Sequence, residues 1–354
     1  MDRSLLLDVQ HLKTAFPSKE GELFAVNDVS LQLQPGEILG LVGESGSGKS
    51  VTGFSLMNLI DKPGKVVNGN VYFKGQDLLT LPEKAMRSLR GNRIAMIFQD
   101  PMMTLNPVLR IDVQMIETLQ AHKKISYKAA RARAEEALAL MGVPSPKERL
   151  QSYPYQLSGG MRQRVAIAIA LLLQPDLIIA DEPTTALDVT IQAQILSEVQ
   201  KLAHNYGTAL IWITHDLSVV AGLADRIAVM YAGKIVESGS SEAVLTHPQH
   251  PYTQGLINSL PSHNIRGERL TQINGITPNL ADLPSGCAFA PRCERATEQC
   301  HTQPHLTPIS EDNSDIPHQV SCFFPSHSVE KRQIRQSITS STTSSTAIAE
   351  EPTL

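Results

Sequence analysis

A glycine-rich segment that follows an apolar run constrains the fold of this chain more than any other feature. The segment matches the pattern G-x-x-x-x-G-K-S/T and consists of Gly43, Glu44, Ser45, Gly46, Ser47, Gly48, Lys49 and Ser50. Residues 37–42 before it are typical of a buried strand, and residues 49–60 have the apolar spacing of a helix. A strand, a glycine loop and a helix in this order predict a phosphate-binding α/β domain. Lys49 is then expected to contact the β- and γ-phosphates, and the Ser50 hydroxyl to bind Mg²⁺.

A second apolar run ends in two carboxylates. Residues 177–180 are apolar and lead into Asp181 and Glu182. A carboxylate at the end of a strand beside the glycine loop can hold Mg²⁺, and we assign this role to Asp181. The neighbouring Glu182 is expected to polarise the attacking water. Taken alone, such a strand end is more often a solvated surface feature, but the upstream glycine loop favours the functional interpretation.

A third motif opens a helix about a hundred residues after the glycine loop. Ser158, Gly159 and Gly160 precede an apolar-periodic stretch at residues 161–173. An ordinary serine N-cap followed by a glycine turn would give the same pattern. However, glycines at a helix start cost stability unless something approaches closely, and Arg162 and Arg164 lie where the helix dipole disfavours cations. Both features favour a second phosphate-binding site.

Four single residues extend the nucleotide site. Gln99 follows an apolar run and could reach both Mg²⁺ and water, and His215 ends another such run and could contact a γ-phosphate. Asp188 follows Glu182 by six residues. Phe16 could stack on an adenine or equally belong to the core. Each is weak alone, because a lone polar side chain at a strand end is more often structural.

The remaining sequence predicts an α/β protein in three parts. Residues 1–250 predict a nucleotide-binding domain with a mostly parallel core sheet and a helical insertion at about 100–170. Residues 251–325 form a smaller irregular domain that contains all four cysteines, and residues 326–354 a disordered tail. The net charge of −4 gives no indication of nucleic-acid binding. The longest uncharged apolar run is residues 165–173, too short to span a membrane, and no signal peptide is evident, so we expect a cytoplasmic location.

Taken together, the motifs resemble the nucleotide-binding subunit of ATP-binding-cassette (ABC) transporters over about residues 5–250. The resemblance implies a P-loop cassette fold with an antiparallel β subdomain and a helical subdomain. It also implies that two cassettes face each other head to tail, with each ATP between one glycine loop and the other signature helix. Ser158, Gly159 and Gly160 would then act on the partner's ATP, Asp188 would lie in the D-loop, and Gln99 would also report to a membrane subunit.

Further segments, among them residues 181–188 and 250–253, are similar to those of the dipeptide/oligopeptide importers. This subfamily implies an ATP-hydrolysing subunit at the cytoplasmic face of the cell membrane. Its expected partners are a homologous second cassette, two transmembrane permease subunits and, indirectly, an extracytoplasmic peptide-binding protein. Met161 stands where the family more often has Gln. Another transported solute, such as a metal chelate or a sugar, remains an alternative.

The cysteines form a second chemical group. Cys287, Cys293, Cys300 and Cys322 have the spacing C-x5-C-x6-C-x21-C, without the tighter pairs that zinc prefers. Two disulfides, zinc, a [4Fe–4S] cluster and free thiols are all compatible with four cysteines. The spacing does not choose between the metals, but the family resemblance favours the cluster.

Two rival functions are weaker. ABC ATPases of DNA repair or chromosome maintenance usually carry long coiled coils between the glycine loop and the signature, and no sustained heptads occur here. A regulatory module that binds ATP without turnover would not need both Glu182 and His215.

Overall fold

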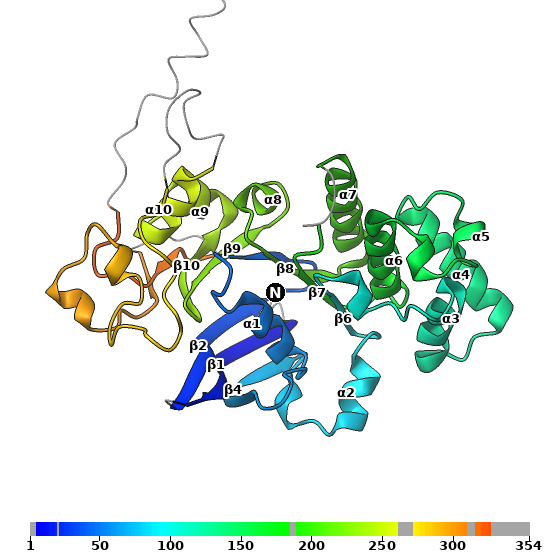
Figure 1. Cartoon of the computed structure of the whole chain (residues 1–354), viewed down its shortest axis with the longest axis horizontal. Coiled ribbons are helices and arrows are strands. Elements are labelled where there is room, and N and C mark those ends of the chain that lie inside the picture. Colours follow the sequence, from blue (N-terminus) through cyan, green and yellow to red (C-terminus); the bar gives the residue numbers. More distant parts are fainter. Residues whose placement is uncertain (1–4, 20, 185–188, 261–271, 310–315, 327–354) are drawn as a thin grey trace, which may run out of the picture.

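Two β-sheets, with helices packed around them, form the protein (Figure 1). The computed structural model describes residues 5–19, 21–184, 189–260, 272–309 and 316–326. The smaller sheet is antiparallel, in the order β2-β1-β4-β5. Its strands are β1 (Leu7–Ser18), β2 (Gly21–Leu33), β4 (Lys65–Phe73) and β5 (Gln76–Asp77).

The larger sheet contains the strands whose carboxyl ends position the residues of the candidate site. Its order is β11-β12-β10-β9-β3-β8-β7-β6, and the run from β9 to β6 is parallel. The strands are β3 (Ile38–Val42), β6 (Ile94–Ile97), β7 (Leu177–Asp181), β8 (Ala209–Thr214), β9 (Arg226–Tyr231), β10 (Lys234–Ser240), β11 (Thr307–Pro308) and β12 (Gln319–Val320). The predicted mostly parallel core sheet and antiparallel β subdomain are confirmed.

Both faces of the larger sheet are buried, which explains the continuous apolar runs of its strands. In β3, Leu39 and Leu41 pack with the smaller sheet, whereas Ile38 and Val42 pack with the helical side. Each side forms one extended apolar core, so the strands are fixed in register on both faces. This burial holds the loops at the carboxyl ends of β3, β6, β7 and β8 in place.

Helices lie around both sheets. A separate group on one side of Figure 1 consists of α3, α4, α5 and α6. Ser126 caps α4, since its Oγ accepts from the Ala129 amide at 3.3 Å. None of the helices in the described part of the chain is both long and apolar enough to cross a membrane. The helices are α1 (Lys49–Leu56), α2 (Glu83–Leu89), α3 (Ile111–His122), α4 (Tyr127–Leu140), α5 (Pro146–Arg149), α6 (Gly159–Leu171), α7 (Val189–Tyr206), α8 (Leu217–Ala221), α9 (Ser241–Thr246) and α10 (Pro251–Asn258).

The C-terminal segment is irregular but joined to the main sheet. It contains the short 3-10 turns η5 (Ala290–Arg292) and η6 (Glu298–His301). Strand β12 pairs antiparallel with β10, with Val320 opposite Glu237. The larger sheet therefore continues from the predicted nucleotide-binding domain into the cysteine-containing segment.

Candidate functional site

The glycine loop turns directly from β3 into α1. Gly48 has φ +100°, and a Cβ at this position would collide with the carbonyl oxygen of Ala25, so only glycine fits. The Lys49 ammonium lies inside the loop and donates to the carbonyl oxygens of Gly43 at 2.8 Å and Glu44 at 2.9 Å. Its burial lowers the pKa of Lys49, while the carboxylates of Glu182 and Asp181 oppose this shift. The loop thus presents a cation next to the free N–H groups at the start of α1.

Ser50 and Asp181 meet where α1 begins and β7 ends. The Ser50 hydroxyl donates to Oδ1 of Asp181 at 2.9 Å. Asp181 is only 3% exposed, and this burial raises the pKa of its carboxyl above the ordinary value. A hydroxyl and a buried carboxylate are hard oxygen ligands of the kind that Mg²⁺ prefers. The pair predicted to hold the metal is therefore in contact.

Glu182 lies between the two polar residues that the sequence singled out. Gln99 Nε2 donates to Oε2 of Glu182 at 3.2 Å, and His215 Nδ1 lies 3.1 Å from Oε1. Each residue follows a different strand, β6, β7 or β8, so the parallel sheet brings the three together at one edge. Both oxygens of the Glu182 carboxylate are thereby oriented.

These groups face one large cleft of about 1050 Å³. Residues from the loop, including Lys49 and Ser50, line it together with Gln99, Glu182 and His215. Phe16 is not among the described residues that line the cleft, and its ring lies against Gly64. A cationic loop, a hydroxyl–carboxylate pair of the kind that suits Mg²⁺ and an oriented carboxylate are the components needed to bind a nucleoside triphosphate and activate water.

The signature segment lies apart from this cleft. Ser158, Gly159 and Gly160 do not line it, and Ser158 and Gly159 are exposed. Ser158 acts as the N-cap of α6, with its Oγ 3.3 Å from the Met161 amide. A Cβ at Gly159 would have no neighbouring atom within 4 Å, so packing within the chain does not require glycine there. The ordinary serine N-cap, which the sequence offered as an alternative, is therefore present. Contacts within the chain do not explain why residue 159 is a glycine.

The two arginines near the start of α6 have structural partners. Arg162 donates to the carbonyl oxygens of Pro154 and Leu157, at 2.9 and 3.1 Å. The buried Arg164 donates to the Met141 carbonyl oxygen at the end of α4, at 3.2 Å. Helix ends offer free carbonyl oxygens and partial negative charge. The inference that these cations indicate a ligand is therefore corrected: both charges are used in packing.

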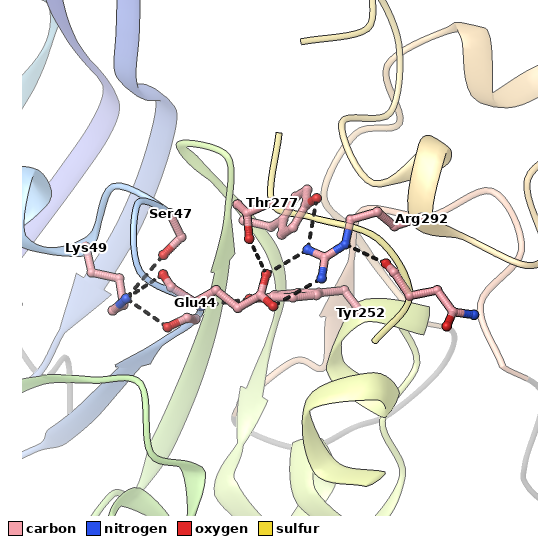
Figure 2. Close-up of polar contacts among 9 residues, drawn as sticks. Glu44, Ser47, Lys49, Tyr252, Thr277 and Arg292 are labelled. Atoms are coloured by element: carbon pink, nitrogen blue, oxygen red, sulfur yellow. Dashed lines mark hydrogen bonds and ion pairs between the residues drawn. The ribbon is translucent and has the colours of Figure 1, made fainter. Parts of the chain in front are cut away.

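The glycine loop also contacts the C-terminal segment, which no sequence motif indicates (Figure 2). Arg292 forms a bidentate ion pair with the Glu44 carboxylate, at 2.7 and 3.1 Å. Thr277 donates to the same carboxylate at 2.9 Å, and the Tyr252 hydroxyl accepts from the Glu44 amide at 2.8 Å. Tyr252 lies in the segment 250–253 that resembles the peptide importers, and Arg292 directly precedes Cys293. No local sequence pattern indicates that either residue contacts Glu44, which is more than 200 residues away.

The four cysteines line one small cavity, together with His250 and Phe289. None of the four is paired in a disulfide. Burial raises the pKa of Cys287, and it raises that of Cys322 to about 11. Among the described residues, no three His, Cys, Asp or Glu side chains form a group that could hold a metal ion. The four cysteines expected to bind an iron–sulfur cluster thus lie around one cavity. Among the described residues, they do not form a ready-made site for a single metal ion.

Asp188 lies outside the described residues, as does the predicted tail from residue 327 onward.

Two family models match the chain. Residues 26–185 match the model described as "ABC transporter". Residues 236–300 match the model described as "Oligopeptide/dipeptide transporter, C-terminal region". The second match includes Tyr252 and Arg292, both of which contact the glycine loop.

Curated relatives resemble nearly the whole chain. It is 47% identical over 325 residues to the probable D,D-dipeptide transport ATP-binding protein DdpD of Escherichia coli (strain K12), covering 92% of this chain and 98% of the relative. It is 49% identical over 302 residues to the oligopeptide transport ATP-binding protein OppD of Haemophilus influenzae, covering 85% and 93%. A solved dimeric ATP-binding cassette in a post-hydrolysis state, bound to ADP and Pi, is 28% identical with a TM-score of 0.62, over 66% of this chain and 98% of that structure.

Proposed function

The chain belongs to the ABC transporter family of ATPases, and we propose that it is the ATP-hydrolysing subunit of an importer for dipeptides or oligopeptides. The main support for ATP hydrolysis is that Gln99, Glu182 and His215 converge on one cleft. Lys49 and Ser50 line the same cleft. In this cleft the loop N–H groups and Lys49 bind the triphosphate, and residues 43–50 surround it.

The proposed chemistry uses four side chains beyond the loop, those of Gln99, Asp181, Glu182 and His215. Ser50, whose hydroxyl contacts Asp181, would hold Mg²⁺ together with Asp181 and Gln99, and the ion would supply positive charge to the phosphate oxygens. Glu182 accepts a proton from the attacking water, and Gln99 and His215 hold its carboxylate in orientation. His215 also contacts the γ-phosphate.

We propose that the complete site requires a second cassette. Ser158 and Gly159 are exposed, and neither they nor the half-buried Gly160 line the chain's own cleft. This supports the arrangement, because it leaves a capped helix start open to a partner's ATP. Asp188 is assigned to the same interface. A homologous cassette is the proposed partner, with two permease subunits in the membrane and a peptide-binding protein outside it.

Peptide import is supported by the C-terminal family match and by the names of the curated relatives. We propose the corresponding division into a cassette at residues 1–250 and a C-terminal domain at residues 251–325, with the protein on the cytoplasmic face of the membrane.

The test of peptide import is to isolate the complex through a tag on this chain and to reconstitute it with its binding protein. Peptides should stimulate ATP hydrolysis. Stimulation by sugars or metal chelates, with none by peptides, would contradict the proposed solute.

We further propose that the four cysteines bind a [4Fe–4S] cluster, supported by their common cavity. A single zinc ion binds sulfur at about 2.3 Å and needs its ligands closer together than a cluster does. The raised thiol pKa values mean that binding would release protons. Protein purified without oxygen should contain iron and absorb broadly near ~400 nm, a property of such clusters. Zinc, or no metal, in that preparation would contradict the proposal.

A further inference from the structure

The cleft has a wall that the cassette alone does not provide. Thr277 and Arg292 line it, although both come from the C-terminal segment. Both bind the carboxylate of Glu44, the second residue of the glycine loop (Figure 2). The segment is therefore in direct contact with the part of the chain that binds phosphate.

The contact fixes Glu44 at both its side chain and its backbone. Arg292 and Thr277 hold the carboxylate, while Tyr252 accepts a hydrogen bond from the backbone amide. The carbonyl oxygen of the same residue accepts from Lys49 at 2.9 Å. A shift of Glu44 would consequently move an acceptor of the lysine that is assigned to the β- and γ-phosphates.

The contact also balances the charge of Glu44 beside the phosphate-binding loop. A free carboxylate on the wall of a phosphate-binding cleft would repel a triphosphate. Arg292 is 5% exposed, so its bidentate pair with Glu44 is poorly screened by water. Burial raises the pKa of Glu44, but hydrogen bonds from Arg292 and Thr277 outweigh it and leave the pKa below its ordinary value. The carboxylate is thus ionised, and Arg292 compensates its charge.

Aromatic rings hold Arg292 in this position. Its guanidinium lies 5.8 Å from the ring centres of both Tyr231 and Phe289, and Nε donates to the Asn274 carbonyl oxygen at 2.9 Å. Tyr231 in turn packs on Tyr252, with ring centres 4.6 Å apart. The arginine is therefore pre-oriented, so little side-chain entropy is lost when it binds Glu44.

We propose that Arg292 is a positioning residue of the nucleotide site: the C-terminal segment neutralises and fixes Glu44 through it, and thereby sets the affinity for the nucleotide phosphates. This inference rests on the proposed binding of ATP by the glycine loop. It gives the C-terminal segment a part in nucleotide binding that is separate from the proposed function of the cysteines.

The test is a double-mutant cycle with direct binding of Mg·ATP and Mg·ADP to the full chain. Arg292→Met should weaken ATP binding on the order of tenfold, as expected when a charged hydrogen-bond partner is lost. ADP binding should weaken less, because ADP carries less negative charge near Glu44. The double variant Glu44→Gln with Arg292→Met should recover most of the ATP affinity, since no uncompensated carboxylate remains.

Arg295→Met is the matched control. Arg295 lies in the same segment but donates to Gln254 at 3.0 Å, and this variant should bind ATP as the wild type does. Thermal unfolding of each variant shows whether the fold is retained. Equal losses for ATP and ADP in Arg292→Met, without recovery in the double variant, would assign Arg292 a purely structural role and overturn the proposal. Unchanged ATP affinity in Arg292→Met would overturn it as well.

The two proposals fail differently. If the wild type does not bind ATP, or if Lys49→Ala binds it normally, nucleotide binding by the loop is wrong. If the wild type binds ATP and Lys49→Ala does not, but Arg292→Met binds like the wild type, only the positioning role of Arg292 is wrong.

Discussion

At the scale of single residues, Asp181 occupies a position that favours function over stability. Its carboxyl is buried and its pKa is raised, so the ionised form at neutral pH costs folding energy. The group therefore contributes stability when protonated and loses it as pH rises. A bound cation reverses this balance, because it favours the charged carboxylate.

This leads to a prediction for Asp181→Asn. The variant should unfold at a higher temperature than the metal-free wild type at neutral pH, by roughly a few degrees, because it removes a buried charge. It should also lose Mg²⁺-dependent ATP hydrolysis, since the carboxylate ligand is gone. Calorimetry and a hydrolysis assay check the two halves. A variant that is less stable and still active would contradict the assigned role.

At the scale of elements, His250 fixes the start of α10. Its Nδ1 accepts from the Tyr252 amide at 3.1 Å, which requires the unprotonated ring. Burial lowers the pKa of His250 to about 4, and the nearby Glu237 only partly opposes this. Since the unfolded chain binds the proton near its ordinary value of 6.5, stability is lost as pH falls from about 6.5 to about 4.

We predict that His250→Asn makes this pH dependence weaker. Asparagine caps helices well and does not titrate. The wild type should lose up to about 3 kcal/mol more unfolding free energy than the variant between these pH values. Denaturant unfolding at several pH values measures the difference. Parallel pH profiles of the two proteins would show that His250 does not carry the effect.

A matched pair of caps tests the start of α6. Ser158 and Ser126 each cap a helix with an Oγ at 3.3 Å from a backbone amide. Alanine at either position should cost about 1 kcal/mol of stability. Only Ser158→Ala should also reduce ATP hydrolysis by the assembled complex, while its own ATP binding stays intact. Equal hydrolysis by both variants would leave Ser158 with its capping role alone.

The elements near the nucleotide site could be predicted from sequence because their signals are local. The strand before residue 43, the helix after it and the cap at Ser126 each rest on adjacent residues. By contrast, the sequence positions of Arg162 and Arg164 indicate a ligand only because the sequence does not show their carbonyl partners. The Glu44–Arg292 pair joins positions 248 apart, and only the folded chain brings them together.

At the scale of the whole molecule, we propose that the chain contributes to two different nucleotide sites. Its cleft holds Lys49, Ser50 and Glu182, whereas Ser158 and Gly159 are exposed and do not line this cleft. The C-terminal segment extends the main sheet through β12 and reaches the glycine loop through Arg292. We therefore propose that the nucleotide site depends on the cassette, on the C-terminal segment and on a partner cassette.

The most direct measurement is ATP turnover and nucleotide retention by Glu182→Gln in the complex isolated through a tag on this chain. Glutamine preserves the size of the side chain but cannot accept the proton from water. We predict that the variant binds ATP like the wild type, loses turnover by on the order of a hundredfold or more, and retains ATP in a closed cassette dimer. Turnover at the wild-type rate, or a variant that holds no ATP, would contradict the assignment of this cleft as the site of hydrolysis.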